Sequence, residues 1–289
     1  MYRAEDAIQG RSVNSPKKPR KIRLEAVTVC VDYSDFLAYS VLFNKSAFDR
    51  WVIVTSPTDE ATRRLCEYHD LEYVVSNRFY EPDGWQPKSH GQGRLYKPPF
   101  AKAKGINDGL KALDGDGWVL HIDADIVLPP RAREMIERTG LVPQNIYGID
   151  RLMSKSFEEF AIHLTYPEVQ HDANIFIRGN SFPFNVRVGN HRDDNGGGWL
   201  PIGFFQLWNP AGSGIKAYPE QHNSAGRTDM QHAMRWPIER RLLIPEVIGI
   251  HLESETTMMS ANWSGRRTRY FGPREAERHI AQHPKKEWL

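Results

Sequence analysis

The stretch 117–130, "GWVLHIDADIVLPP", decides the fold of this chain of 289 residues. An apolar run carries two aspartates at its exit, Asp123 and Asp125, and then stops at two prolines. A buried carboxylate is costly to desolvate unless another group pairs with it. The stretch therefore predicts a buried strand that ends at the two aspartates, and a further group that pairs with both of them.

Outward from this strand, apolar stretches alternate with segments of helical spacing. The predicted strands of the first half are 23–34, 50–57, 71–77 and 117–130, and the predicted helices are 35–48, 59–70 and 100–113. Nearly continuous apolar strands separated by helices are typical of a parallel sheet that is covered on both faces. In such a sheet the ligand lies beyond the carboxyl ends of the strands. Asp32 lies at such an end, as Asp123 and Asp125 do.

The second half is less regular. We expect strands at 145–153, 200–210 and 240–252, helices at 132–140 and 154–170, and a Gly-rich loop at 191–199. The simplest interpretation is a basic N-terminal arm, 1–21, followed by one mixed-sheet domain, 22–289. A nucleotide-binding half would end at residue 130, and an acceptor-binding half, 131–289, would end in a lid over the donor.

Composition places the chain among soluble globular proteins, with 40% hydrophobic and 26% charged residues and a net charge of +2. Two cysteines, Cys30 and Cys66, indicate no disulfide framework. We find no signal peptide and no apolar run long enough to span a bilayer, so we predict a cytoplasmic protein. Seven basic residues lie in each of 1–23 and 265–289. These ends are either solvated tails or contacts to nucleic acid or phosphate.

The Asp-x-Asp pattern has a specific chemical meaning at a strand exit. Two carboxylates within reach of one cation suit Mg²⁺ or Mn²⁺, which keep further coordination positions for substrate phosphates. An isolated Asp-x-Asp is more often a plain strand exit or turn, so the surrounding sequence has to support the metal interpretation.

That support comes from a family resemblance. The stretch 100–130, "FAKAKGINDGLKALDGDGWVLHIDADIVLPP", resembles the core of GT-A nucleotide-sugar glycosyltransferases. "VTVCVDYSDFL" and "WVIVTSPTDEATRRLCEYHDLEYVV" are similar to the first nucleotide-binding unit of that fold, and the resemblance covers residues 22–153. It implies a Rossmann-like α/β fold with a mixed central sheet flanked by helices.

The resemblance implies a donor site, in which Asp123 and Asp125 hold the metal on the diphosphate. The other implied donor residues are Asp32, Tyr33, Thr55, Asp59, Lys102, Lys104 and Asn107. The lysines could equally solvate an exposed helix face, and Asp59 could be a helix N-cap.

Further implied residues lie near the C-terminus. His251 follows an apolar strand and is the candidate third metal ligand, while Arg266 and Arg267 would close over the diphosphate. Related proteins have a shorter gap and a lysine there, so a basic surface loop stays an alternative.

Asp229 is the candidate general base, because an acceptor hydroxyl must lose a proton as it attacks the anomeric carbon. Asp194 is the second candidate for this role. As an alternative, Asp229 would cap a helix over 230–236. Trp208 and Trp263 are the candidates for an exposed acceptor platform, whereas other aromatics of the same segments are expected in the core.

These residues predict a metal-dependent hexosyltransferase that uses a nucleotide sugar, with a UDP-sugar as the expected donor. The acceptor could be a hydroxymethylated base in DNA, a glycan, a lipid-linked sugar or a protein side chain. Two alternatives remain: a non-catalytic nucleotide-sugar or carbohydrate-binding protein on the same fold, and a nucleotidyltransferase. The latter usually has a Gly-rich loop after its first strand, which "VDYSDFLAYS" lacks.

Overall fold

The computed structural model describes most of the chain. The described residues are 21–79, 100–154, 157, 160–161, 186–187, 191–192, 199–221, 225–252 and 271–272. The predicted N-terminal arm, the loop after residue 79 and most of the predicted helix 154–170 lie outside them.

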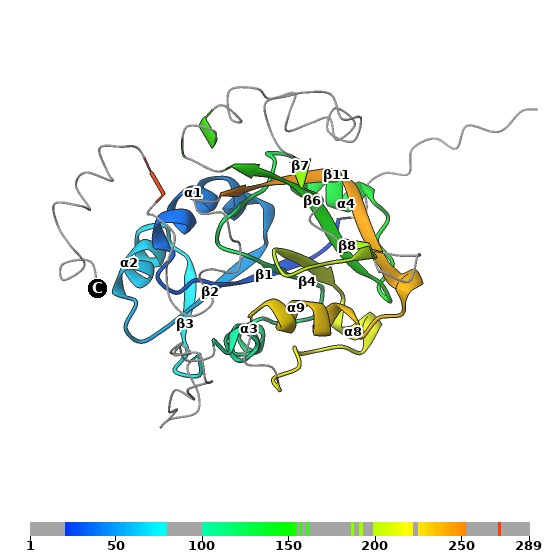
Figure 1. The fold of residues 1–289 in the computed structure, drawn as a ribbon, viewed down its shortest axis with the longest axis horizontal. Coiled ribbons are helices and arrows are strands. Elements are labelled where there is room, and N and C mark those ends of the chain that lie inside the picture. The colour runs from blue at the N-terminus through cyan, green and yellow to red at the C-terminus, as the bar shows by residue number, and fades with distance from the viewer. Residues whose placement is uncertain are drawn as a thin grey trace, which may run out of the picture.

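The first half forms the parallel part of a nine-stranded sheet (Figure 1). Its strands β1 (Leu24–Val29), β2 (Arg50–Thr55), β3 (Glu72–Val75) and β4 (Trp118–Ile122) lie in the order β3-β2-β1-β4. The connecting helices are α1 (Ser34–Asn44), α2 (Glu60–Tyr68) and α3 (Lys102–Ala112). The predicted strands 23–34, 50–57 and 71–77 and the three predicted helices are therefore confirmed, and the predicted strand 117–130 is confirmed only in its first part, β4. Only β3, at the edge of the sheet, departs from the expected full burial.

The second half extends the same sheet with mixed directions. Beyond β4 follow β10 (Phe205–Trp208), β6 (Ile146–Ser154), β11 (Arg241–Leu252) and β5 (Ile126–Val127). β10 is antiparallel to both of its neighbours, and β6 is parallel to β11. The predicted mixed sheet flanked by helices is confirmed. The remaining elements include α4 (Ala132–Arg138), β7 (Val186–Arg187), β8 (His191–Arg192), β9 (Trp199–Leu200), α8 (Pro210–Ser213) and α9 (Ala225–Ala233).

The stretch 117–130 is not one strand, as its sequence predicts, but two. β4 ends at Ile122, the two aspartates lie in a turn, and β5 then pairs antiparallel with β11. The amide of Asp123 donates to the carbonyl of Phe204 (3.2 Å), and the carbonyl of Asp125 accepts from the amide of Leu252 (2.7 Å). The chain thus passes from β4 in the middle of the sheet to β5 at its edge, and both aspartates lie in the connection between these strands.

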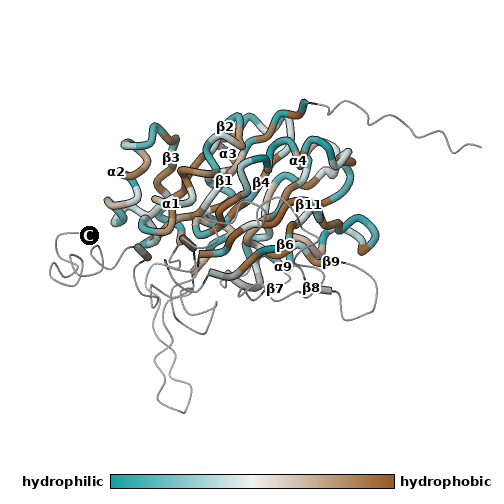
Figure 2. Tube along the Cα trace, turned by 90° about the horizontal axis from the view of Figure 1, so that it is seen from above, coloured by the Kyte–Doolittle hydropathy of each residue, from teal (hydrophilic) through white to brown (hydrophobic). Residues whose placement is uncertain are grey.

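Hydrophobic residues concentrate in the central strands, and hydrophilic residues lie along the outer helices (Figure 2). α3 contacts β1, β2 and α9, and α3 and α9 lie together on one side of the sheet in Figure 1. This arrangement places the N-terminus of α3 and one face of α9 near the exit of β4. No described helix is long and apolar enough to cross a membrane.

Candidate active site

Three charged side chains from separate elements meet at the exit of β4. Lys102, the first residue of α3, directs its Nζ to Oδ1 of Asp123 (2.8 Å) and to Oδ2 of Asp229 on α9 (3.5 Å). Burial alone would lower the pKa of Lys102, but the two carboxylates outweigh it, so the pKa lies above its usual range. The ammonium therefore stays charged between two acids.

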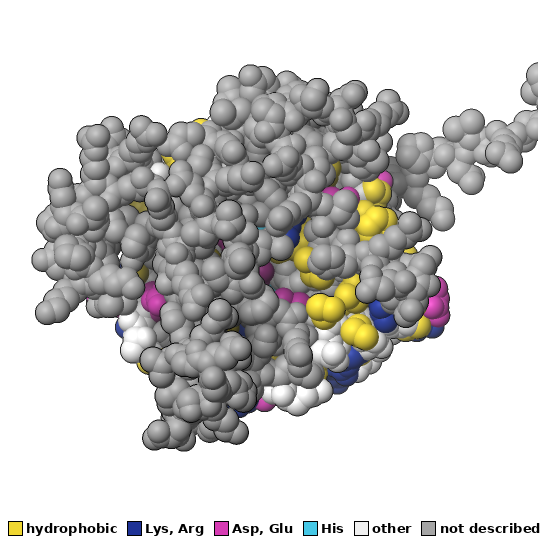
Figure 3. All heavy atoms as spheres, in the orientation of Figure 1, with side chains coloured by type: hydrophobic (Ala, Val, Ile, Leu, Met, Phe, Trp, Pro, Cys, Tyr) yellow, Lys and Arg dark blue, Asp and Glu magenta, His cyan; other side chains and the backbone are white. Residues whose placement is uncertain are grey.

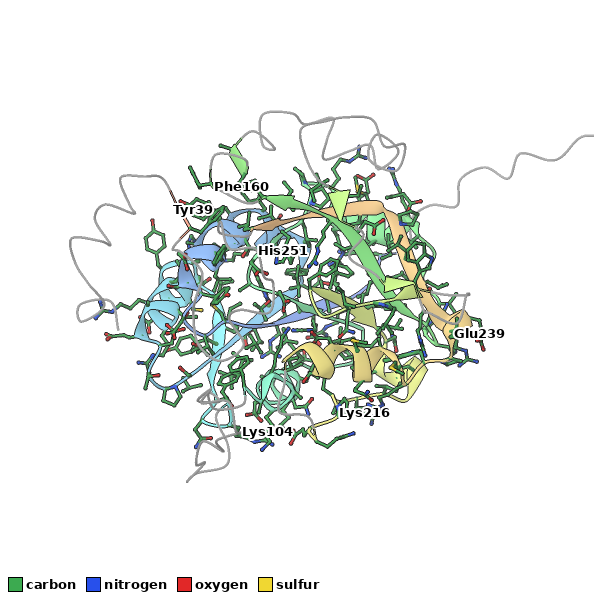
Figure 4. The ribbon with its side chains drawn as sticks, viewed as in Figure 1. Tyr39, Lys104, Phe160, Lys216, Glu239 and His251 are labelled. Carbon is green, nitrogen blue, oxygen red and sulfur yellow. The ribbon has the colours of Figure 1, made fainter. Side chains whose placement is uncertain are left out.

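A second pair lies on the other side of the turn. His251 faces Ile126 across the β5–β11 pairing, which brings its Nε2 within 3.1 Å of Oδ2 of Asp125. Burial raises the pKa of Asp125, but His251 and then Arg151 outweigh it, and the net pKa is below its usual range. Asp123 differs: burial keeps its pKa raised despite Lys102. Figure 4 shows His251 toward the middle of the molecule.

The donor set of this turn fits a divalent cation. Adjacent ligands of an octahedral ion with bonds of about 2.1 Å are about 3 Å apart. Asp125 and His251 are in hydrogen-bonding contact at 3.1 Å, so both side chains are also within reach of one ion. The buried Oδ1 of Asp125 has no hydrogen-bond partner among the described residues. Within the same residues, however, no three His, Cys, Asp or Glu side chains are close enough to hold a metal as they stand. Asp123 would have to exchange Lys102 for the ion.

Asp229 does not cap a helix, contrary to the alternative considered from the sequence. It lies inside α9, with its carboxylate buried and its Oδ1 without a partner in the described part of the chain. Burial raises the pKa of Asp229, Lys102 opposes this and Asp123 adds to it, giving a pKa of about 6. A carboxylate with a pKa this close to neutrality can accept a proton and release it again.

A chain of buried hydrogen bonds lies beneath these acids, and sequence reasoning missed it. Gln206 donates to the carbonyls of Pro201 (2.7 Å) and Asp229 (2.9 Å), so its Oε1 is the acceptor for the hydroxyl of Tyr218. That hydroxyl must then accept from Nδ1 of His121 (3.2 Å). The lone pair of His121 Nε2 consequently faces Oδ1 of Asp123, 3.6 Å away. The spacing of His121 and Asp123 along one strand was the available sequence signal.

Gly203 is a further residue that the site requires. A Cβ at this position would overlap the carboxylate of Asp229. We expect Gly203→Ala to displace that carboxylate and to lower the free energy of unfolding by about 1–3 kcal/mol, as overpacking does. Urea denaturation of the variant measures this loss.

The control for this prediction is Gly203→Ala combined with Asp229→Ala, which removes the overlapping atoms. In the Asp229→Ala background, Gly203→Ala should lower the free energy of unfolding much less than it does in the wild type. An equal loss in both backgrounds would contradict the proposed packing.

Of the predicted nucleoside-binding residues, two have internal roles instead. Asp59 is the N-cap of α2, accepting from the amide (3.0 Å) and hydroxyl (2.6 Å) of Thr62, and Thr55 donates to it (3.1 Å). The helix-cap alternative is therefore correct for Asp59. It also accepts from the amide of Asp32 (2.9 Å), whose backbone has the left-handed φ of 59°. Asp59 and Thr55 thus hold the exposed Asp32, which precedes the half-buried Tyr33, in an uncommon conformation.

Two residues of α3, Asn107 and Lys104, interact with the segment that contains Tyr218 and Glu220. Asn107 uses both amide hydrogens, on the carbonyl of Tyr218 (3.0 Å) and on Glu220 (2.9 Å), and accepts from the amide of Tyr218 (2.7 Å). Asn107 therefore anchors this segment, and the donor-binding role stays a prediction for it. Lys104 lies on the outer side of α3 (Figure 4), where its charge contributes to lowering the pKa of Glu220.

Trp208 is not an exposed acceptor platform, so that prediction is wrong. It is fully buried, and its Nε1 donates to the carbonyl of Ile215 (2.8 Å). Four further predicted site residues lie outside the described part of the chain: Asp194, Trp263, Arg266 and Arg267.

Arg151 of β6 is a site residue that the sequence did not indicate. Its guanidinium lies 4.4 Å from the centre of the Phe204 ring, and it is buried. Its charge helps to lower the pKa of Asp125. Acidic side chains with a basic one beside them are visible near the middle of the face in Figure 3.

No protein-family model and no curated protein sequence matches this chain. Among solved structures it matches the mannosyltransferase PcManGT from Pyrobaculum calidifontis in complex with GDP-Man and Mn²⁺, with 15% identity, 94% of this chain and 67% of that chain covered, and a TM-score of 0.45. A glucosyl-3-phosphoglycerate synthase from Mycobacterium tuberculosis, in complex with Mn²⁺, UDP-glucose and phosphoglyceric acid, matches with 13% identity, 45% and 44% coverage, and a TM-score of 0.30.

Mannosyl-3-phosphoglycerate synthase from Rubrobacter xylanophilus matches with 19% identity, 45% and 40% coverage, and a TM-score of 0.31. This chain spans less than half the length of the two synthases. All three proteins are glycosyltransferases, the class that the sequence resembles. At these scores the matches carry no weight in assigning the function, which rests on the site itself.

Proposed function

We propose that this chain is a metal-dependent glycosyltransferase that moves a sugar from a nucleoside diphosphate to an acceptor hydroxyl. One observation carries the proposal. The turn after β4 presents Asp125 with His251 at 3.1 Å. Lys102 links the neighbouring Asp123 of this turn to a buried carboxylate, Asp229, with a pKa of about 6. A cation site next to a proton acceptor is what this transfer needs.

In the proposed reaction each group has one task. Asp123, Asp125 and His251 would hold a divalent cation, which neutralises charge on the leaving diphosphate when it is bound. Asp229 takes the proton of the acceptor hydroxyl while the new bond to the anomeric carbon forms and the bond from that carbon to the diphosphate oxygen breaks. In this scheme the acceptor would attack the face of that carbon opposite the leaving diphosphate, which would invert its configuration.

The donor can be identified by its release of nucleoside diphosphate. The protein is incubated with UDP-, GDP- or ADP-sugars in Mn²⁺, Mg²⁺ or EDTA. UDP-glucose and other UDP-hexoses are tried first. We expect slow release from one nucleotide class, dependent on the metal and lost in Asp125→Ala. Asp116→Ala is the matched control, because Asp116 lies in the exposed loop before β4. Equal release in EDTA, or no release together with no metal-dependent nucleotide binding, would overturn the proposal.

We also propose DNA as the first acceptor to test, because basic residues concentrate at both ends of the chain. Those segments lie outside the described residues apart from a few positions. A phosphate-contacting protein loses duplex affinity steeply as salt rises. Titration of duplex DNA between low and physiological salt measures this, and weak, salt-independent binding would direct the search to glycans, lipid-linked sugars and proteins.

A further inference from the structure

Lys102 lies where a sugar diphosphate would not reach it in the present arrangement. Its side chain is only 10% exposed, and its ammonium is enclosed by Asp123 at 2.8 Å and Asp229 at 3.5 Å. Lys104, two residues further along the helix, lies on the outer side of α3 (Figure 4). The two lysines therefore have different environments, although the sequence suggested the same role for both.

The pairing of Lys102 conflicts with a metal at Asp123. Lys102 already holds one oxygen of Asp123, Oδ1, with its positive charge, and a cation at this carboxylate would repel that charge. The described residues contain no cluster of three metal ligands in this arrangement. Asp229 is buried and Asp123 is partly exposed, and each ionised carboxylate disfavours the charge of the other unless a positive charge compensates. Lys102 supplies that charge, so it stabilises the cation-free site and opposes the entry of an ion.

The position of Asp229 gives the displaced ammonium a second partner. Its Oδ2 is already within 3.5 Å of Nζ, and its Oδ1 has no partner in the described residues. The lysine can thus move from one acid to the other by a small rotation, without leaving the buried site uncompensated.

We propose that Lys102 is an exchangeable internal cation, which pairs with Asp123 in the metal-free protein and shifts to Asp229 when a divalent metal binds Asp123. This inference rests on the proposed function, because it assumes a metal at the turn. Lys102 is then a positioning residue that links occupation of the metal site to the orientation and charge of the acceptor-side carboxylate. Binding of the metal would then prepare the donor site and reposition the charge next to the base Asp229 at the same time.

The alternative role is a direct contact between Lys102 and the diphosphate. In that case Lys102 would affect the binding of the nucleotide and have little effect on the binding of the metal alone. Affinity for Mn²⁺ in the absence of any nucleotide separates the two roles, and it does not depend on turnover.

The test measures the Kd for Mn²⁺ alone, from the electron paramagnetic resonance signal of the free ion. Four proteins form a double-mutant cycle: the wild type, Lys102→Met, Asp229→Asn and the combination. We expect Lys102→Met to tighten Mn²⁺ binding about tenfold, a coupling of ordinary size for contacting charges. Asp229→Asn should weaken binding about threefold, because Lys102 then has only Asp123 as a partner.

Non-additivity is the decisive result. Once Lys102 is absent, Asp229→Asn should have a clearly smaller effect on the Kd than it has in the wild type. Simple loss of charge would instead give additive changes. Lys104→Met is the matched control for long-range charge, and its Kd should stay within about twofold of the wild type. Lys102→Gln replaces Lys102→Met if circular dichroism shows that the methionine variant does not fold.

The outcomes separate this inference from the proposed function. Unchanged or weaker Mn²⁺ binding in Lys102→Met, or additive effects in the cycle, would overturn the exchange while the wild type still binds the ion. Failure of the wild type to bind Mn²⁺ would overturn both.

Discussion

Replacement of Asp229 by asparagine is expected to lower kcat by about 10²- to 10⁴-fold, the range typical of a lost general base. The amide keeps the size and most contacts of the carboxylate but cannot take the proton of the acceptor hydroxyl. KM for the donor should change little, because Asp229 contacts Lys102, whereas the proposed metal ligands are Asp123, Asp125 and His251. Steady-state kinetics with saturating donor and acceptor measure both constants.

The same base predicts the direction in which kcat changes with pH. Because burial raises the pKa of Asp229 to about 6, the base is protonated below that pH and ionised above it. The wild-type kcat should therefore fall with a slope of one as pH drops through about 6 or a lower value, since a shift of Lys102 toward Asp229 in the metal-loaded enzyme would lower this pKa, and the limb should be absent in Asp229→Asn. Glu239→Gln, at an exposed position far from His251 (Figure 4), should keep the wild-type profile. A variant that retains full kcat, or the same acid limb, would exclude Asp229 as the base.

Asp125→Asn is expected to abolish measurable turnover at micromolar Mn²⁺, with kcat/KM reduced by at least about 100-fold. The substitution removes the negative charge that pairs with His251 and leaves a weaker ligand for the cation. Activity should recover in part as the Mn²⁺ concentration rises, since the amide oxygen can still coordinate an ion. Activity measured across a Mn²⁺ titration tests this.

The control for Asp125→Asn is Asp116→Asn, which changes the same residue type in the exposed loop before β4. It should follow the wild-type titration. If Asp125→Asn had the same dependence on Mn²⁺ as the wild type, the turn after β4 would not be the metal site.

The parallel half of the fold could be predicted because its signal is local. Each of its strands is a short apolar run with a helix-forming segment beside it, and the pattern holds for β1, β2 and β4. The family resemblance suggested Asp125 and His251 as partners, each at the end of an apolar run, and the antiparallel pairing of β5 with β11 brings them together.

Other features depend on contacts between distant segments, and sequence did not reveal them. The break after Ile122 arises because the next residues pair with β11, more than 100 positions away along the chain. Trp208 was misjudged for this reason, because the segment around Ile215 covers it. The helix-cap alternative for Asp229 failed because Asp229 lies inside α9, while its role as the base stays a prediction. The buried chain from Gln206 to His121 is visible only once four separate segments are packed together.

The binding of a nucleoside diphosphate with and without metal tests the central claim most directly. UDP, GDP and ADP are titrated by calorimetry into the wild type and Asp125→Asn, in Mn²⁺ and in EDTA. The proposed site predicts that one of the three nucleotides binds the wild type in Mn²⁺, and that this binding is lost both in EDTA and in the variant. Binding of equal strength in EDTA, or no binding of any of the three nucleotides in Mn²⁺, would contradict it.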